Sequence, residues 1–338
     1  MDYVETINET LKPRTTEEAV VLDLFAGCGG LSLGFEAAGY KTAGYELLKC
    51  ASDTYSRNLT GKCGCRRLKV GFDYDESDKI DIIVGGPPCQ PFSVCGKQMG
   101  MDDARDGFPI FIDAVARLKP KMFLFENVRN LAFSHRWYLD LIVLELKKLG
   151  YLVDFKCLNA ADYGVPQNRE RLFVVGHKSR FQFPLAVPCR TVVSQAIGDT
   201  MEKCDENSRM LTPSQDKYIA SYEEKSHCKR PRDLYPDIPA RTITCRNLAG
   251  ATGDMLRVRL PDGRRRRITV REAARLQSFP DWFEFSGNET QCFNQIGNAV
   301  PPLLSYKLAI QIKESYSLPV KTEEEIRETN ESETLFRS

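Results

Sequence analysis

The chain has 338 residues, of which 42% are hydrophobic, and its formal net charge at pH 7 is +1. This is enough apolar material to bury a core in one large domain or two unequal ones, and no apolar run is long enough to cross a bilayer. Residues 1–13 are polar and acidic, which is not typical of a secretory signal, so we expect a soluble protein of the cytoplasm.

The first half of the chain alternates strand-like and helix-like segments. Short apolar runs rich in β-branched residues predict strands at residues 19–25, 41–46, 80–84, 122–125 and 171–176. Apolar residues at helical spacing predict helices at 31–39, 48–58, 108–119 and 137–149. Strands separated by helices of this length predict βαβ units, and therefore an α/β fold with a mostly parallel sheet.

The pattern changes after residue 177, where prolines interrupt it. Helical periodicity returns at Thr269, which has the spacing of a capping box with Glu272. We expect both ends of the chain to be mobile, because they are polar and poor in core residues. The predicted parts are an N-terminal extension, a catalytic and cofactor-binding domain, an inserted module, a return segment that completes the catalytic domain, and an acidic tail, at 1–18, 19–177, 178–262, 263–317 and 318–338.

The near-zero net charge hides a local asymmetry. Residues 225–271 carry 13 Lys or Arg against 4 Asp or Glu, a local charge of +9, whereas the tail after Lys313 is acidic. A concentrated basic segment in a near-neutral protein favours a polyanion-binding face. A solvated surface is the alternative that composition leaves open.

The 12 cysteines raise the question of disulfides or metal. They are scattered, and the one close pair, Cys63 and Cys65, has one intervening residue rather than two. No second pair with histidines at zinc spacing follows. We therefore expect reduced thiols and no metal site.

A glycine-rich turn, Phe-Ala-Gly-Cys-Gly-Gly at residues 25–30, follows the first predicted strand and enters a helix. Such a turn lets the backbone approach a ligand closely and points helix N–H groups at it. No Lys-Ser or Lys-Thr follows, which argues against a nucleotide triphosphate. Glu46 ends the next strand about 20 residues on, where an acidic side chain commonly binds ribose hydroxyls. The combination favours S-adenosylmethionine over NAD as the cofactor.

Residues 85–93 read Gly-Gly-Pro-Pro-Cys-Gln-Pro-Phe-Ser and follow another predicted strand. Three prolines stiffen this loop, so Cys89 is held at the carboxyl end of a strand, where open α/β sheets bind their ligands. A nucleophile is one interpretation of Cys89. A small apolar filler is the other.

Three further charged residues flank predicted strands. Glu126 follows the strand at 122–125, where it could donate a proton to a substrate that Cys89 attacks, or serve as a surface or capping carboxylate. Arg169 and Arg171 lie on one face beside the strand at 171–176. They could fix a phosphate or a base carbonyl, or form an ion pair with Glu170 or Glu126.

Six stretches in this order resemble the cytosine-C5 DNA methyltransferases of the bacterial restriction–modification type. The resemblance covers about residues 20–177 and 263–305, and the matching stretches lie at 23–31, 86–93, 126–128, 167–171, 275–280 and 295–302. It implies a Rossmann-like sheet that uses S-adenosylmethionine, with a smaller inserted target-recognition domain.

The resemblance also implies a mechanism. The Cys89 thiolate would attack C6 of a cytosine that is flipped out of the duplex, which makes C5 nucleophilic. Glu126 would hold and protonate N3, and Arg171, with Arg169 behind it, would lie near the base O2 and its phosphate.

In the same resemblance, Phe25 would pack on the adenine of the cofactor and Glu46 would bind the ribose. Asp73 is the nearest match to the acid that meets the adenine amino group, although this chain has Gly-Phe-Asp where the family usually has Gly-Asp-Ile. The other residues that would border the cofactor are Gly27, Gly29, Gly30, Leu31, Pro88, Asn298 and Val300.

The resemblance assigns the DNA contacts to two regions. A loop at 94–105 would close over the DNA, and the residues assigned to the DNA around it are Gln90, Ser93 and Arg105. In the inserted module the expected contacts are Arg241, Thr242, Arg246, Arg257 and Arg259, of which the last three would read guanine edges. Residues 264–267, four consecutive arginines, would grip phosphates unless they form a solvated turn.

The expected partner is double-stranded DNA, with a cognate restriction endonuclease as a functional partner, no membrane, and a monomeric enzyme. An RNA cytosine methyltransferase of the related tRNA-modifying branch is a second hypothesis, and the large basic insert favours duplex DNA over it. A DNA-binding or regulatory relative with a decayed site is a third, and the presence of Cys89, Glu126, Arg169 and Arg171 argues against it. A dehydrogenase is a distant fourth, because hydride transfer needs no Pro-Pro-Cys-Gln.

Overall fold

The computed structural model of the chain describes residues 2–75, 80–88, 106–204, 208–227, 231–250 and 253–335. The chain divides into two compact units, which we call the sheet unit and the insert unit. The sheet unit comprises Pro13–Leu158, Glu170–Leu185 and Ser305–Ser338. The insert unit comprises Met1–Lys12, Asn159–Arg169 and Ala186–Leu304.

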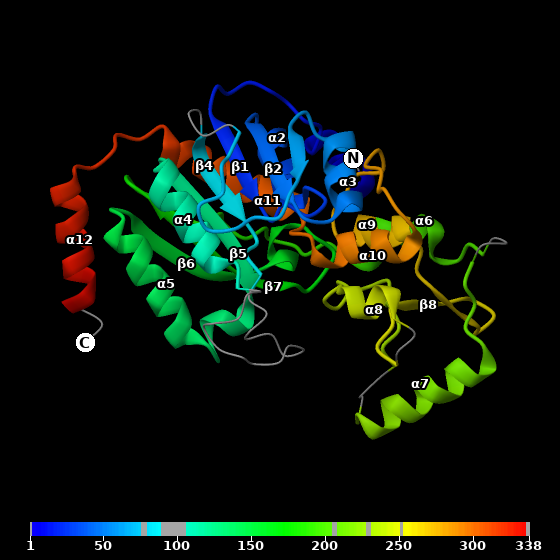
Figure 1. The fold of residues 1–338 in the computed structure, drawn as a ribbon. Coiled ribbons are helices and arrows are strands. Elements are labelled where there is room, and N and C mark those ends of the chain that lie inside the picture. Colours follow the sequence, from blue (N-terminus) through cyan, green and yellow to red (C-terminus); the bar gives the residue numbers. More distant parts are fainter. Residues whose placement is uncertain are drawn as a thin grey trace. The chain divides into compact units, whose positions relative to one another are not determined.

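The described part of the sheet unit is built on a seven-stranded sheet with the order β3-β2-β1-β4-β5-β7-β6 (Figure 1). Its strands are β1 Val20–Leu24, β2 Lys41–Glu46, β3 Lys62–Cys65, β4 Ile80–Gly85, β5 Met122–Val128, β6 Leu152–Asn159 and β7 Glu170–His177. The pairs from β3 through β5 are parallel, and β7 runs antiparallel to β5. The predicted α/β fold with a mostly parallel sheet is confirmed.

Helices pack on both faces of this sheet. The helices of the described part of this unit are α2 Gly30–Ala37, α3 Lys49–Asn58, α4 Phe108–Leu118, α5 Arg136–Lys148, α11 Pro302–Tyr316, most of which belongs to this unit, and α12 Glu323–Leu335. On one face, Phe108 of α4 lies against Phe125 of β5 and Tyr138 of α5, with ring centroids 5.2 and 5.8 Å apart. On the other face, Tyr55 of α3 donates a hydrogen bond to Thr42 of β2 at 2.7 Å. The sheet is therefore doubly wound, as βαβ units require.

Two strands were absent from the predicted elements. β3 reads Lys-Cys-Gly-Cys and has no β-branched residue, so it forms by pairing with β2 rather than from its own propensity. β6 ends the strand order, and its middle residues alternate between exposed and partly exposed positions instead of forming an apolar run. Neither strand carries the signal of a strand buried on both faces.

Both ends of the chain differ from the expected mobile, core-poor segments. Residues 3–10 form helix α1, Tyr3–Thr10, whose capping box joins Asp2 and Glu5. Ile7 and Leu11 are fully buried. At the other end, Ile326 of α12 is 3% exposed. A few apolar residues at helical spacing are enough to bury one face of a helix whose other residues are polar.

The insert unit holds short helices and one hairpin. Besides α1, its helices are α6 Val193–Met201, α7 Pro213–Lys225, α8 Cys245–Ala249, α9 Val270–Leu276 and α10 Glu289–Asn298. The antiparallel hairpin consists of β8 Arg257–Arg259 and β9 Arg265–Arg267. The capping box of Thr269 and Glu272 at the start of α9 is confirmed.

The unit is larger than the module predicted at 178–262, because it also takes in α1, residues 159–169 and most of the predicted return segment. Across the described residues, we find no helix of the length and apolar character needed to span a membrane.

Candidate functional site

The carboxyl edge of the sheet brings several predicted site residues into one row. The strand order reverses between β1 and β4, and ligands bind at such a switch point in open α/β sheets. In the register of the sheet, Leu24 pairs with Tyr45 and Gly85, and Gly85 pairs with Phe125. The next residues along the chain, Glu46, Phe25, Gly86 and Glu126, therefore lie in one row at the carboxyl edge of the parallel strands.

Close packing at this edge requires glycine. A Cβ atom on Gly85 would lie 2.4 Å from the carbonyl oxygen of Leu24, a distance too short for any residue with a side chain. The Gly86 N–H also donates to this carbonyl at 3.3 Å. The glycine pair thus allows the strand that carries the Pro-Pro-Cys loop to lie directly beside the strand that carries the glycine-rich turn.

The glycine-rich turn has a backbone conformation that is unusual for its first residue. Phe25 has a φ of 61°, and Gly27 and Gly29 have φ values of 57° and 88°. A bulky residue in the left-handed region is a genuine outlier, which surrounding contacts must hold in place. Two hydrogen bonds do so: the Ala26 N–H donates to Tyr45 O at 3.0 Å, and the Gly27 N–H donates to Glu46 Oε2 at 2.9 Å.

Glu46 therefore has a structural contact in addition to the predicted ribose contact. Its Oε1 accepts from the Leu48 N–H at 2.8 Å while Oε2 accepts from Gly27. A carboxylate can accept about four hydrogen bonds, so two acceptor positions remain for ribose hydroxyls. The next side chains, Leu47 and Leu48, are 49% and 57% exposed, which places apolar surface beside this carboxylate.

Beneath the turn lies a buried polar network that the sequence analysis did not identify. Ser32 of α2 donates to Asp23 Oδ2 at 2.6 Å, and Tyr55 donates to Ser32 at 3.0 Å and to Thr42 at 2.7 Å. Asp23 is 1% exposed, and this burial raises the pKa of its carboxyl group to about 7. The hydrogen bond from Ser32 opposes the rise. The start of α2 is thus tied to β1 by a carboxyl group that titrates near neutral pH.

Asp73 lies between two buried aromatic residues. Phe72 and Tyr74 both pack against Tyr45 of β2, with ring centroids 5.1 and 5.8 Å away, while Asp73 itself is exposed. The segment is anchored further by the Asp75 N–H, which donates to the hydroxyl of Tyr45 at 3.0 Å. These contacts place Asp73 near the strand that carries Glu46.

The loop that carries the predicted nucleophile is anchored where the structure describes it. Asn127 of β5 is buried and donates from Nδ2 to Pro87 O at 2.9 Å, and the Gly107 N–H donates to Pro88 O at 2.9 Å. Asn127 is a positioning residue that sequence reasoning missed, although it stands directly after Glu126. The sequence signal for it was its position in the stretch 126–128, directly after a predicted site residue. Cys89, Gln90, Ser93 and Arg105, and the predicted mobile loop, lie outside the described residues.

Two of the predicted catalytic residues meet at the sheet edge. Arg171 Nε lies 3.0 Å from Glu126 Oε1, and the side chains are 16% and 12% exposed. The antiparallel register of β5 and β7 places Arg171 opposite Val128, two strands away from β4, which carries the Pro-Pro-Cys loop. The ion pair with Glu126, one of the alternatives for this arginine, is therefore present. It holds a carboxylate at the edge in one orientation.

Arg169 differs from its prediction. It lies in the insert unit with 2% exposure, and its guanidinium donates to three carbonyl groups: Ile243 O at 2.7 Å, Gly297 O at 3.1 Å and Ala299 O at 3.1 Å. A guanidinium enclosed in this way does not reach a base or a phosphate. We correct its role to that of a clamp between segments that are far apart in the sequence.

Two buried glutamines complete this clamp. Gln167 Oε1 accepts from the Ile243 N–H at 2.8 Å, and its amide nitrogen lies against the Gln277 side chain. Gln277 Nε2 donates to Ile296 O and Ala299 O, each at 2.9 Å. Three of the motifs, around residues 168, 277 and 297, thus hold one another through buried hydrogen bonds.

The two predicted cofactor residues of the insert unit lie at the end of this clamp. Asn298 ends α10, is exposed, and accepts a hydrogen bond from the Cys245 thiol at 2.9 Å. Val300 is 7% exposed. The carbonyl groups on either side of Asn298, those of Gly297 and Ala299, accept hydrogen bonds from Arg169, and Gln277 also donates to Ala299 O, directly before Val300.

The predicted DNA-reading residues have unequal exposure. Arg257 is fully buried, so the prediction that it reads a guanine edge is corrected. Arg241 is 28% exposed and forms an ion pair with Asp254. Arg246 in α8 is exposed, and Arg259 is 52% exposed beside Asp233. Thr242 donates from its hydroxyl to Asn168 O at 2.7 Å.

The arginine run at 264–267 is also corrected. Arg264 is 64% exposed, but Arg265 is 12% exposed and Arg266 is 2% exposed. Arg266 forms an ion pair with Glu272 at 2.7 Å and donates to Thr200 O. Alternate residues of a strand face opposite sides, so a run of charges in β9 cannot all point to the solvent. Of the three strand residues, Arg266 is a core residue.

A pocket of about 470 Å³ lies beside Arg241 and Thr242. Its wall includes Leu234, Tyr235 and Ile238, so it is apolar on one side and polar on the other. Among the residues that the structure describes, no group of three or more His, Cys, Asp or Glu side chains is arranged to hold a metal ion.

A doubly wound sheet with a glycine-rich turn after β1 and a carboxylate after β2 defines a Rossmann-like protein of the S-adenosylmethionine-dependent methyltransferase class. Residues 20–314 match the family model of the C-5 cytosine-specific DNA methylases, and the chain belongs to this family.

Relatives support this assignment. The chain is 56% identical over 319 residues to type II methyltransferase M.AplI of Arthrospira platensis, covering 93% of this chain and 91% of the relative. It is 34% identical to type II methyltransferase M.XorII of Xanthomonas oryzae pv. oryzae, covering 86% and 84%. Among solved structures, the methyltransferase EhMeth of Entamoeba histolytica matches 90% of this chain and 100% of its own, with a TM-score of 0.69 and 18% identity, which shows the shared fold.

Proposed function

We propose that this enzyme is a type II DNA methyltransferase that methylates C5 of cytosine within a specific sequence of duplex DNA, as part of a restriction–modification system. The observation that carries the proposal is the Glu126–Arg171 pair. Glu126 of this pair lies on β5, the strand next to β4, and β4 is followed by Pro87 and Pro88, which directly precede Cys89 in the sequence. A cysteine nucleophile, an acid and a guanidinium on successive strands suit attack on a pyrimidine ring.

In the proposed reaction, the Cys89 thiolate adds to C6 of cytosine, and the π electrons of the C5–C6 double bond move toward C4 and N3. Glu126, in its protonated form, donates its proton to N3 and so neutralises the negative charge that develops there, while Arg171 keeps the carboxyl group in place and faces the O2 side. After C5 has accepted the methyl group, a base removes the C5 proton, N3 returns its proton to Glu126, and Cys89 leaves as a thiolate, which restores the aromatic ring.

Cys28 is a poor alternative to Cys89 as the nucleophile. It is 2% exposed, and burial raises the pKa of its thiol to about 12. The thiolate is the reactive form of cysteine, so a buried thiol with a raised pKa is inert at neutral pH. This contrast supports the assignment of the reaction to the cysteine of the Pro-Pro-Cys loop.

The residues at the turn fit S-adenosylmethionine. Glu46 keeps acceptor positions for the ribose, Phe25, whose backbone is held in the left-handed region, offers a partly buried ring for the adenine, and a Cβ atom at Gly27 would meet no neighbour within 4 Å. Asp73, Pro88, Gly29, Gly30 and Leu31 would complete the pocket within the sheet unit. When bound, the cofactor supplies the methyl group that C5 accepts.

The C6 atom of a stacked cytosine is out of reach of a side chain. The proposed attack therefore requires that the cytosine is flipped out of the duplex before Cys89 can add to it. Exposed basic residues of the insert unit, Arg246, Arg259 and Arg264, are the candidates for holding the surrounding DNA.

The decisive variant is Cys89→Ala. We expect it to abolish methyl transfer to unmethylated plasmid DNA and to leave S-adenosylmethionine binding unchanged, because the thiol acts on the base and not on the cofactor. Radiolabelled methyl transfer and calorimetric titration with the cofactor measure the two effects. Full methylation by the variant would contradict the mechanism, and loss of both properties would show that the site had unfolded.

Two further assays separate the proposal from its rivals. Methyl transfer to duplex DNA and to tRNA, measured side by side, distinguishes a DNA enzyme from an RNA enzyme. A duplex that carries 5-fluorocytosine traps a covalent adduct if Cys89 is a working nucleophile, whereas a non-enzymatic relative leaves none. Bisulfite sequencing of DNA from expressing cells then gives the base and the sequence. The monomeric state, the cytoplasmic location and the cognate endonuclease stay predictions.

A further inference from the structure

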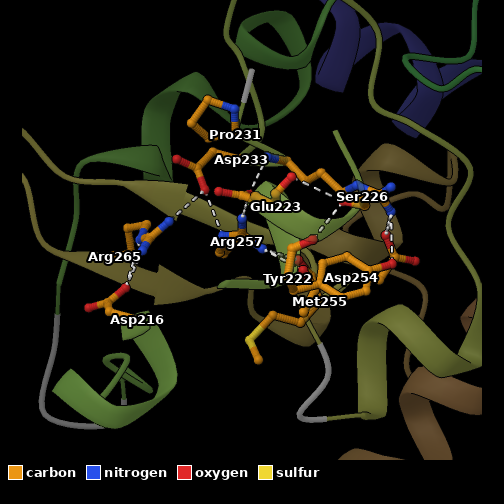
Figure 2. Close-up of polar contacts among 12 residues, drawn as sticks. Asp216, Tyr222, Glu223, Ser226, Pro231, Asp233, Asp254, Met255, Arg257 and Arg265 are labelled. Atoms are coloured by element: carbon orange, nitrogen blue, oxygen red, sulfur yellow. Dashed lines mark hydrogen bonds and ion pairs between the residues drawn. The ribbon is translucent and has the colours of Figure 1, made fainter. Parts of the chain in front are cut away.

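Arg257 and Arg265 of the hairpin lie against one buried carboxylate of the insert unit, Asp233 (Figure 2), and Arg259 of the same hairpin contacts it as well. Asp233 is 4% exposed, and its Oδ1 lies 2.6 Å from Arg257 Nε and 3.6 Å from an Arg265 nitrogen. Its other oxygen, Oδ2, accepts two hydrogen bonds from Arg259, at 3.2 and 3.3 Å. One carboxylate thus faces three guanidinium groups.

Arg257 is the permanent counterion in this group. It has no exposed surface, and besides Asp233 it contacts Glu223 of α7 at 2.5 Å and the carbonyl groups of Gly253 and Met255 at 3.2 Å each. Figure 2 shows Arg257 between Asp233 and Glu223. Because all these partners are buried or partly buried, Arg257 keeps the Asp233 charge compensated whatever happens at the surface.

Arg259 is placed differently. It stands two residues after Arg257 in β8, so both side chains leave the strand on the same face. Its side chain is 52% exposed, and its contacts with Asp233 are longer than the 2.6 Å contact of Arg257. Arg259 can therefore keep its Nε and Nη2 contacts with Asp233 and still turn its remaining N–H groups toward an acceptor in the solvent.

We propose that Asp233 is a positioning residue that presents Arg259 to DNA, with Arg257 as the buried counterion that keeps Asp233 in place. This inference rests on the proposed function. The planar guanidinium of Arg259, oriented beforehand by two hydrogen bonds to one oxygen, offers its outer N–H groups to a pair of acceptors on the duplex, either the O6 and N7 atoms of guanine or two phosphate oxygens. Pre-orientation lowers the entropy lost when the contact forms.

A double-mutant cycle on the full-length enzyme tests this. The variants are Asp233→Asn, Arg259→Ala and both together, and the measured quantities are KM for unmethylated plasmid DNA and kcat. We expect Arg259→Ala to raise KM about tenfold, the order of one lost bidentate contact. Asp233→Asn should raise KM by a similar factor, and the double variant by no more than either single one, since both changes remove the same contact.

The cycle separates positioning from general damage to the fold. If Asp233 acted through folding alone, Asp233→Asn would raise KM by the same factor whether residue 259 is Arg or Ala, and that result would overturn the inference. Arg264→Ala is the matched control, because Arg264 is 64% exposed on the same hairpin and pairs with Asp262 instead. Its effect on KM should multiply with that of Asp233→Asn.

A second variant keeps the test decisive if Asp233→Asn does not fold. Arg259→Lys retains the positive charge and loses the planar pair of donors. We expect its KM to match that of Arg259→Ala, and a KM equal to the wild type would overturn the inference. If the wild-type enzyme methylates no DNA, both the proposed function and this inference are wrong. If the wild type is active and the KM effects of Asp233→Asn and Arg259→Ala multiply in the double variant, only this inference is wrong. The salt dependence of KM then distinguishes a phosphate contact from a guanine contact.

Discussion

The sheet unit and the insert unit use their charged side chains in different ways. At the carboxyl edge of the sheet the charges are few: backbone N–H groups hold Glu46, Arg171 pairs with Glu126, and the amide of Asn127 holds the neighbouring loop. In the insert unit, arginines and carboxylates neutralise one another inside the fold, as Arg257 with Asp233 and Arg266 with Glu272.

The difference follows from how each unit builds its core. A sheet covered by helices buries long apolar strands, so it is stable without charges and can leave them for a site. The insert unit has short helices and one hairpin of three-residue strands, and it fastens them with buried ion pairs instead. A net basic charge of +9 between residues 225 and 271 therefore overstates the number of arginines that DNA can meet.

The largest effect is expected at Glu126, where a charge at the sheet edge is predicted to serve catalysis and not stability. The change Glu126→Gln keeps the shape of the side chain and removes its ability to exchange a proton, so we expect kcat to fall about 10²- to 10⁴-fold. Steady-state methylation of plasmid DNA measures it. Glu170→Gln is the matched control, because Glu170 is 52% exposed beside Arg129 and should leave kcat near the wild-type value. Equal losses in the two variants would contradict the role of Glu126.

The second prediction concerns the charges that hold the insert unit. Arg257→Met removes a guanidinium with no exposed surface and leaves Asp233 and Glu223 without their main partner. We expect the free energy of unfolding to fall by about 3 kcal/mol, in the range for one partner lost from a buried pair. Urea denaturation measures it. Arg264→Ala should change the free energy of unfolding by less than about 0.5 kcal/mol. Equal effects of the two changes would contradict the prediction that only the buried arginine stabilises the fold.

The smallest predicted effect concerns Asp23, which is a buried acidic residue in the unit that otherwise depends on apolar strands for its core. Its folded pKa of about 7 lies above the ordinary value of 3.8, so the folded protein keeps a proton there that the unfolded chain releases. The free energy of unfolding should therefore fall as the pH rises from about 4 to 7 and level off above 7. Between pH 5, two pH units below the folded pKa, and pH 8, the expected fall is about 2.7 kcal/mol.

The matched variant for this effect is Asp23→Asn, which keeps an acceptor for Ser32 and cannot titrate. Urea denaturation at pH 5 and pH 8 gives the change in stability for each protein. We expect the difference between the two pH values to be larger in the wild type than in Asp23→Asn. An identical pH dependence would show that Asp23 is ionised across the whole range.

Some of the site was predictable because its residues follow strands directly. Glu46, Glu126 and the glycine-rich turn each stand one residue after an apolar run, and parallel strands bring such positions to one edge. The contact partner of Arg171 was harder to predict. Glu170 is its neighbour in sequence, but the antiparallel pairing of β5 and β7 determines that the side chain meets Glu126 instead.

The amino-acid sequence by itself determined the α/β fold, the positions of the main strands and the family, because these depend on local apolar patterns and on short motifs that can be recognised in order. Only the tertiary structure decided which charges are available. Arg257 and Arg259 are the same residue type two positions apart, yet one is enclosed by Glu223 and Asp233 and the other is half exposed. The availability of a charge depends on partners that are distant in the sequence, and the fold alone brings those partners together.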